Sequence, residues 1–183
     1  GNIWGDGGRQ LTEGWLAQGG YLRPAEDVNL VLRTMCSHNP PPWPAPDPPS
    51  GIRNYFTTFR YAGNDFAVLE DRKFKAAAKP DLRQAPDDQL LGPDQLAMLD
   101  DLAGWPGDRP RVVVSQTIYA GIQTYPKTGE MRPEGDSNAW PVAGRNRALN
   151  AFAKANAVLL TGDQHLGTLA RLPTSDATGS VYQ

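Results

Sequence analysis

The sequence is poor in cysteine, in net charge and in long apolar runs. Cys36 is the only cysteine among the 183 residues, which excludes an intrachain disulfide and a zinc site built from several cysteines. The 18 basic and 20 acidic residues leave a net charge of −2, so no signature of nucleic-acid or anionic-membrane binding is present. No stretch approaches the roughly 18 apolar residues of a transmembrane helix, and no membrane partner is expected.

The chain also lacks an initiator methionine and a signal-peptide pattern, because Gly1 opens directly into polar, glycine-rich sequence. We therefore expect a processed or truncated start, and the cellular compartment is left open. A length of 183 residues suits one globular domain and is short for two. A single domain over 1–183 is the expectation, and no internal repeat divides it.

Glycine (19 residues) and proline (17 residues) are abundant instead, and both occur in clumps, which predicts long Gly/Pro-rich loops. Seven prolines in 40–49 are incompatible with a helix, so residues 38–50 are predicted to form an extended Pro-rich loop. Such a segment can dock into an aromatic groove of another protein. A non-catalytic interaction module is therefore one candidate function.

Apolar periodicity and turn residues divide the remaining chain into helices and strands. The predicted elements are a helix over 25–37, strands over 54–61 and 66–70, a helix over 93–103, a strand over 111–116, a helix over 144–156 and a strand over 157–162. The last three form a strand–helix–strand unit, which predicts parallel strands and a right-handed crossover. Both strands carry continuous apolar runs, a pattern typical of strands buried on both faces. The predicted fold class is α/β.

Asp163 and His165 follow the last predicted strand, directly after Gly162. Open α/β sheets bind ligands at the carboxyl ends of their strands, where these two side chains can reach toward one point. Divalent metals accept both a carboxylate and an imidazole. Alternatively, Asp163 caps a turn and His165 is a hydrogen-bonded loop residue, and the spacing alone leaves both interpretations open.

Five segments carry a family resemblance: LEDRKFK (69–75), LLGPDQLAMLDDL (90–102), RVVVSQTIYAG (111–121), DSNAWPVAGRNRAL (136–149) and GDQHLG (162–167). Together they resemble, in order and spacing, the alkaline phosphatase D-like enzymes, which belong to the calcineurin-like metallophosphatases. The resemblance covers most of 51–170. It implies part of a metallophosphatase sandwich, with a mixed sheet and the strand–helix–strand unit at the C-terminal end.

The resemblance implies a metal-dependent phosphoric ester hydrolase, an alkaline phosphatase or phosphodiesterase acting on a small phosphate ester. In such a site two metal ions, drawn from Fe, Mn, Zn or Ca, activate a water molecule that attacks the phosphoryl group. Asp163 and His165 would be the catalytic metal ligands of this chain, and Asn2 matches an asparagine ligand of the family.

Five further residues are candidates for binding the substrate. Arg145 and Arg147 stand near the start of a predicted helix, where guanidinium groups favour phosphate, although a solvated helical face is the alternative. Asp71 and Arg72 follow a predicted strand and could equally form a salt bridge there. Tyr119 could line the substrate cleft or simply anchor its loop.

The sequence departs from the family upstream, because the early carboxylate, the G-D-x-x-Y strand end and the D-D-H-D segment are not in this chain. The chain alone is therefore expected to be inactive or nearly so, since two or three ligands do not hold a dinuclear centre. Activity would require an N-terminal segment, a partner chain or a homo-oligomer. The family is often periplasmic or secreted. Half a sandwich also predicts a bare sheet face that a dimer would bury.

Overall fold

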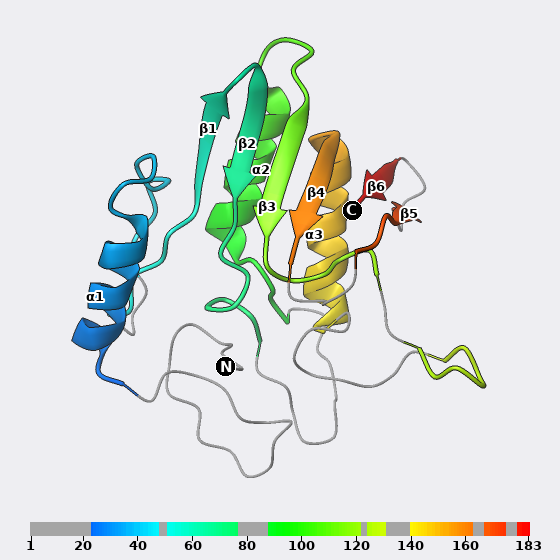
Figure 1. Ribbon diagram of the computed structural model, residues 1–183, viewed down its shortest axis with the longest axis horizontal. Coiled ribbons are helices and arrows are strands. Elements are labelled where there is room, and N and C mark those ends of the chain that lie inside the picture. The colour runs from blue at the N-terminus through cyan, green and yellow to red at the C-terminus, as the bar shows by residue number, and fades with distance from the viewer. Residues whose placement is uncertain are drawn as a thin grey trace.

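A six-stranded sheet forms the centre of the computed structural model, which describes residues 23–47, 51–76, 88–121, 124–130, 140–162, 167–174 and 179–183. The strands lie in the order β1-β2-β3-β4-β6-β5 (Figure 1). Their bounds are β1 Thr57–Tyr61, β2 Asn64–Val68, β3 Arg111–Ser115, β4 Ala157–Thr161, β5 Arg171–Pro173 and β6 Ser180–Tyr182. Strands β2, β3, β4 and β6 are parallel, whereas β1 and β5 are antiparallel to their neighbours. The predicted α/β class with a mixed sheet is confirmed.

Strands β1 and β2 form a hairpin whose two-residue turn is Ala62-Gly63. Both turn residues have positive φ, 49° for Ala62 and 81° for Gly63, which matches the twist of a tight hairpin and is easiest for glycine. On the flanking strands the rings of Phe59 and Phe66, which face each other in the register, stack with centroids 5.1 Å apart. The two strands predicted over 54–61 and 66–70 are therefore present, and the structure shows that they form a hairpin.

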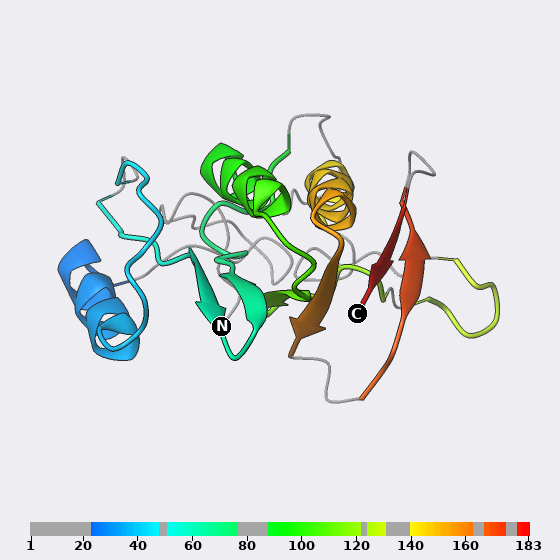
Figure 2. The same ribbon diagram turned by 90° about the horizontal axis from the view of Figure 1, so that it is seen from above.

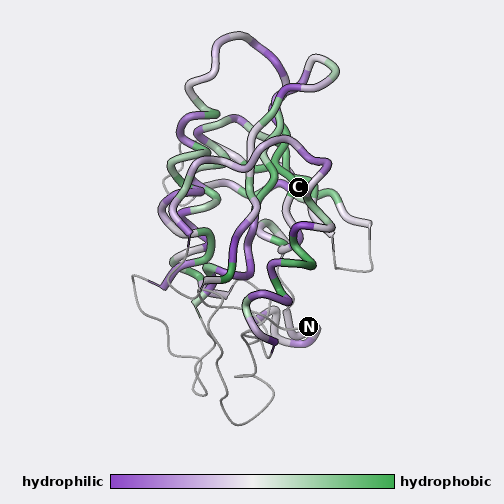
Figure 3. The backbone as a smooth tube through the Cα atoms, turned by 90° about the vertical axis from the view of Figure 1, so that its left-hand side faces the viewer, coloured by the Kyte–Doolittle hydropathy of each residue, from purple (hydrophilic) through white to green (hydrophobic). Residues whose placement is uncertain are grey.

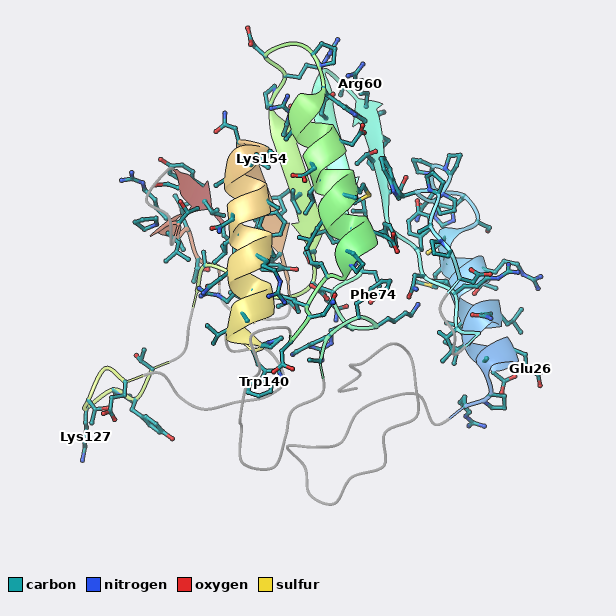
Figure 4. The ribbon with its side chains drawn as sticks, turned by 180° about the vertical axis from the view of Figure 1, so that it is seen from behind. Glu26, Arg60, Phe74, Lys127, Trp140 and Lys154 are labelled. Atoms are coloured by element: carbon teal, nitrogen blue, oxygen red, sulfur yellow. The ribbon has the colours of Figure 1, made fainter. Side chains whose placement is uncertain are left out.

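Two helices cover one face of the sheet, α2 Pro93–Gly104 and α3 Val142–Lys154 (Figures 2 and 4). Helix α2 starts with Pro93 at its first position, where a missing N–H costs nothing, and buries Met98, Leu99 and Leu102. Helix α3 connects the parallel strands β3 and β4 and buries Ala148, Leu149 and Phe152. The strand–helix–strand unit predicted from the sequence is confirmed.

Helix α3 comes very close to the segment that precedes α2. A Cβ atom added at Gly144 would lie 2.6 Å from the backbone nitrogen of Leu90 and 2.9 Å from the carbonyl carbon of Gln89. Because both neighbours are backbone atoms, only glycine fits here without moving one of the two segments. This contact brings the first turn of α3 against the segment that precedes α2.

The main core lies between the sheet and helices α2 and α3. From the sheet it receives alternate residues, among them Ala67, Val113 and Leu159, all nearly inaccessible to solvent. The opposite face is different, since Val158 is 45% exposed and Leu160 56% exposed. The expectation that β4 is buried on both faces is therefore wrong: only one face is covered among the described residues.

Helix α1, Ala25–Cys36, stands apart from the other two, beside the hairpin (Figure 1). It has no buried residue, and Leu30, Val31 and Met35 are largely exposed. Polar and apolar positions alternate along the helix (Figure 3). No helix of the described residues is long and apolar enough to cross a membrane.

The described part of the Pro-rich loop is bound to the molecule's own chain. The backbone N–H of Trp43 donates to the carbonyl of Phe56 at 2.8 Å. The hydroxyl of Thr57 donates to the carbonyl of Pro41, and the hydroxyl of Tyr55 donates to that of Pro40. Part of this segment's capacity to pair with a partner groove is therefore already used inside the chain.

Candidate functional site

The carboxyl ends of β2, β3, β4 and β6 meet at one edge of the sheet, because these strands are parallel. Each strand delivers a polar side chain there: Asp71 just after β2, Ser115 at the end of β3, Thr161 at the end of β4 and Gln183 just after β6. The start of α3 lies at the same end of the molecule, as Trp140 shows, opposite Arg60 and Lys154 (Figure 4). This edge is where α/β sheets bind their ligands.

The carboxylate of Asp71 joins the ends of β2 and β3. Its Oδ2 atom accepts hydrogen bonds from the Ser115 hydroxyl at 2.5 Å and from the backbone N–H of Thr117 at 2.6 Å. All three residues are buried. A buried carboxylate is tolerable only when donors compensate for lost water, and these two donors do so for Oδ2.

Tyr119 is the centre of a second set of contacts. Its hydroxyl lies 3.0 Å from the Ser115 hydroxyl and 3.5 Å from Oδ2 of Asp71, and its ring packs edge-on against Phe152. Burial, followed by the nearby Asp71 carboxylate, raises the pKa of the Tyr119 hydroxyl well above its usual value of 10.0. The phenol is therefore neutral, and its hydroxyl makes buried hydrogen bonds with Ser115 and Asp71.

Arg145 reaches the same loop from the first turns of α3. Its Nε–H donates to the carbonyl of Tyr119 at 2.5 Å, and the residue is only 7% exposed. Burial lowers the pKa of its guanidinium group. The alternative that Arg145 belongs to a solvated helical face is therefore wrong.

Gln183 ties the loop after β3 to the end of β4. Its Oε1 atom accepts from the backbone N–H groups of Tyr119 (2.9 Å) and Ala120 (2.7 Å), and its Nε2 donates to Oγ1 of Thr161 at 2.8 Å. Its backbone pairs in both directions with Ala170. The side chain thus joins the loop after β3 to one of the strand ends that form this edge, that of β4.

Three buried side-chain atoms at this edge have hydrogen-bonding capacity left over. Asp71 Oδ1, Thr117 Oγ1 and Arg145 Nη2 have no hydrogen-bond partner among the residues that the structure describes. Buried polar groups are rarely left unsatisfied without a functional reason. An acceptor, a hydroxyl and a guanidinium N–H are together suited to a polar ligand or to ordered water.

The other predicted substrate residues are placed differently. Arg147 is half-buried, and its Nη2 donates to the carbonyl of Asp88, which precedes α2 in the chain. The backbone N–H of Arg72 donates to Oε1 of Glu70 at 3.0 Å. Asp71, Tyr119 and Arg145 are therefore brought together by the structure, and Arg147 is directed toward another segment.

The predicted metal ligands Asp163, His165 and Asn2 lie outside the described residues. What the structure describes is the strand end that leads to two of them, Thr161 and Gly162, at the edge just described. Among the residues that the structure describes, no group of three or more His, Cys, Asp or Glu side chains could hold a metal ion.

Residues 32–182 match the family described as PhoD-like phosphatase. The chain belongs to the PhoD-like phosphatase family. In three dimensions the fold is similar to the solved structure of PhoD, with a TM-score of 0.54 and 21% sequence identity over 74% of this chain. The chain spans only 29% of the PhoD chain, and no curated protein matches it.

In this PhoD-like chain, sequence reasoning missed Ser115, Thr117 and Gln183 as members of the site. Ser115 and Thr117 carried a usable signal, because they are the polar residues that follow the apolar run of β3 at its carboxyl end. Gln183 carried none. It follows a three-residue strand that no periodicity reveals, and its partners lie far away in the sequence.

Proposed function

We propose that the carboxyl edge of the sheet is part of the phosphate-ester site of a metal-dependent phosphoric ester hydrolase, of phosphatase or phosphodiesterase type. The observation that carries this proposal is Arg145: a nearly buried guanidinium whose Nε is fixed by Tyr119 while Nη2 has no partner among the described residues. A desolvated guanidinium is stabilised most by a planar or tetrahedral oxyanion such as phosphate. Membership of the PhoD-like phosphatase family supports the same substrate class.

Asp163 and His165, with Asn2, are proposed as the metal ligands of this chain. The carboxylate, imidazole and amide donors suit a divalent or trivalent ion such as Fe, Mn, Zn or Ca, and Asp163 follows the strand end at this edge by two residues. When bound, the metal ions, two in this proposal, supply Lewis-acid activation of water and of the phosphoryl group. His165 would coordinate a metal ion through one neutral ring nitrogen. Asp163 would either coordinate the metal ion through its carboxylate or orient His165 by a hydrogen bond.

The remaining site residues have supporting roles in this proposal. Arg145 holds a phosphoryl oxygen, while Asp71 and Tyr119 keep the loop after β3 closed against the sheet and exclude water behind it. Arg147 and Arg72 are kept as proposed substrate residues on the family resemblance alone, since Arg147 Nη2 donates to the carbonyl of Asp88. The chain spans 29% of the PhoD chain. We therefore propose that the further metal ligands needed for hydrolysis are supplied by a longer chain, a partner chain or a second copy.

The two histidines of the chain provide a direct test. Co²⁺ is titrated into the wild-type chain, Asp163→Asn and His165→Gln, and its visible absorption is followed; each substitution is expected to weaken binding by roughly tenfold or more. His38→Gln is the matched control, since His38 is exposed beyond the end of α1. Turnover of p-nitrophenyl phosphate and of bis(p-nitrophenyl) phosphate is measured with the same metal-loaded samples. Equal Co²⁺ binding by His165→Gln and His38→Gln would remove His165 from the site.

A further inference from the structure

Gln183 holds one peptide group of the loop after β3 in a defined orientation. Its Oε1 atom accepts from the N–H of Ala120, and the carbonyl of Tyr119 belongs to the same peptide unit. In a planar trans peptide the N–H and the C=O point in opposite directions. Fixing the N–H on Gln183 therefore directs the carbonyl toward Arg145 on the other side.

The orientation of the Gln183 amide is itself fixed. Oε1 receives two backbone donors, from Tyr119 at 2.9 Å and Ala120 at 2.7 Å, so the acceptor end of the amide must face the loop. Nε2 then faces Thr161 and donates to its hydroxyl at 2.8 Å. A flipped amide would place an N–H₂ group against two N–H donors, which excludes it.

The resulting chain of contacts runs from Thr161 through Gln183 and the 119–120 peptide to Arg145. Each link is a hydrogen bond of 3 Å or less: 2.8 Å, 2.7 Å and 2.5 Å in order. Hydrogen bonds in such a series polarise and align one another. Because Thr161 ends β4 and Arg145 belongs to α3, the series couples the strand leading to the proposed metal ligands with the proposed phosphate-binding guanidinium.

We infer that Gln183 is a positioning residue for phosphate binding: its carboxamide orients the Tyr119–Ala120 peptide and thereby the guanidinium of Arg145, in register with the end of β4. This inference rests on the proposed function only in its assignment of phosphate to Arg145. The positioning of Arg145 by Gln183 is a separate statement, and it has a readout of its own.

The test follows the side-chain Nε–H signal of Arg145 by ¹H–¹⁵N NMR, assigned from its loss in Arg145→Lys. In the wild type this proton is expected to exchange slowly with water. Gln183→Leu keeps the bulk of the side chain and removes all three hydrogen bonds, so exchange of the Arg145 proton should accelerate at least tenfold. Gln183→Glu keeps both acceptor contacts to the loop and can accept from Thr161, so exchange should stay within twofold of wild type.

Gln116→Leu is the matched control, because Gln116 is exposed next to the same loop, and its Arg145 exchange should be unchanged. Protection of the backbone amides of Val113 and Leu159 monitors the core in every variant. If Gln183→Leu does not fold, Thr161→Val removes only the last hydroxyl of the series and should accelerate exchange by two- to fivefold. Arg145 exchange that is equal in the wild type and in the folded Gln183→Leu or Thr161→Val protein overturns the inference.

A titration with inorganic phosphate separates this inference from the proposed function. In the wild type, phosphate should shift the Arg145 Nε–H signal, and the apparent dissociation constant should rise at least fivefold in Gln183→Leu and be restored in Gln183→Glu. If phosphate leaves the wild-type signal unmoved, the proposed role of Arg145 fails, while the exchange experiment still decides the positioning by Gln183. If phosphate binds equally well to wild type and Gln183→Leu, the positioning role in binding is overturned.

Discussion

The hydroxyl of Ser115 donates a 2.5 Å hydrogen bond to Oδ2 of Asp71, 44 residues earlier in the chain, in the interior of the protein. The contact fastens the end of β3 to the segment after β2. Ser115→Ala is expected to lower the free energy of unfolding by about 1.5–3 kcal/mol, the usual worth of a hydrogen bond to a charged group. Urea denaturation followed by circular dichroism measures the change.

Ser37→Ala is the control for this prediction, because Ser37 is exposed at the end of α1. Its free energy of unfolding should stay within about 0.5 kcal/mol of wild type. A Ser115→Ala protein as stable as the Ser37→Ala protein would show that the buried carboxylate does not depend on this donor.

Tyr119 makes stability depend on alkaline pH. Its pKa is raised in the folded state, first by burial and then by Asp71, whereas in the unfolded chain it titrates near its ordinary value of 10.0. As the pH rises, the unfolded state therefore loses this proton before the folded state does. The contribution of the Tyr119 hydroxyl to the free energy of unfolding is complete below pH 10 and is lost progressively above it. At pH 11 the wild type is therefore expected to be less stable than at pH 8.

Tyr119→Phe removes the titrating hydroxyl and keeps the ring against Phe152. Urea denaturation of both proteins at pH 8 and pH 11 is compared. The wild type should lose more stability between the two values than Tyr119→Phe does. Equal losses would mean that another group, such as Tyr55, whose pKa burial also raises, governs the alkaline limb.

Two helical glycines differ sharply in their surroundings. A Cβ at Gly144 would meet the backbone of Leu90 and Gln89, whereas a Cβ at Gly104 would meet nothing within 4 Å. Gly144→Ala is expected to destabilise the protein by about 1–3 kcal/mol through overpacking. Gly104→Ala should be neutral or stabilising by up to about 1 kcal/mol, because alanine is the better helix former. Thermal unfolding of both variants compares them, and a Gly144→Ala protein at least as stable as wild type would contradict the close contact.

The sheet face that the described residues leave uncovered is a candidate surface for self-association. Val158 and Leu160 expose their side chains on this face, so the chain is expected to self-associate at high concentration in a way that buries them. The double variant Val158→Thr and Leu160→Thr keeps strand-forming residues and should abolish the association. Sedimentation velocity over a range of concentrations measures it.

Leu169→Thr serves as the control, since Leu169 is 88% exposed and lies outside β4. Its sedimentation should follow that of wild type. A wild-type chain whose sedimentation coefficient does not change with concentration would contradict the prediction.

Much of the fold could be predicted because its signals are local. Aromatic and β-branched runs predict the two strands of the hairpin, and Pro93 with regularly spaced leucines predicts α2. The observed bounds agree with the predicted ones within a few residues. The exposure of Leu160 could not be predicted, because an apolar run does not reveal whether other chain covers both of its faces. β5 and β6 have three residues each, too few for a periodic pattern.

The sequence predicts part of the site from residue type and local placement. Asp71 after a predicted strand, Tyr119 in a loop and Arg145 near a helix start are predicted substrate residues, and the structure brings them together. Their geometry was not predictable, because the Asp71–Ser115 and Arg145–Tyr119 contacts join residues 44 and 26 positions apart. The roles of Asp163 and His165 remain predictions, since both lie outside the described residues.

The order of the strands in the sheet also bears on how this chain folds. The β1–β2 hairpin closes a loop of two residues and can form within microseconds. By contrast, the parallel pairs join residues that are far apart in the sequence, Asp65 with Arg111 and Arg111 with Ala157. Each of these pairings requires a long chain segment to close into a loop, which is slow. The polar edge is complete only when β6 has joined β4 and placed Gln183 against Thr161. Folding should therefore be slow for a chain of this size, and binding competence at the edge should appear only after these long-range pairings have formed.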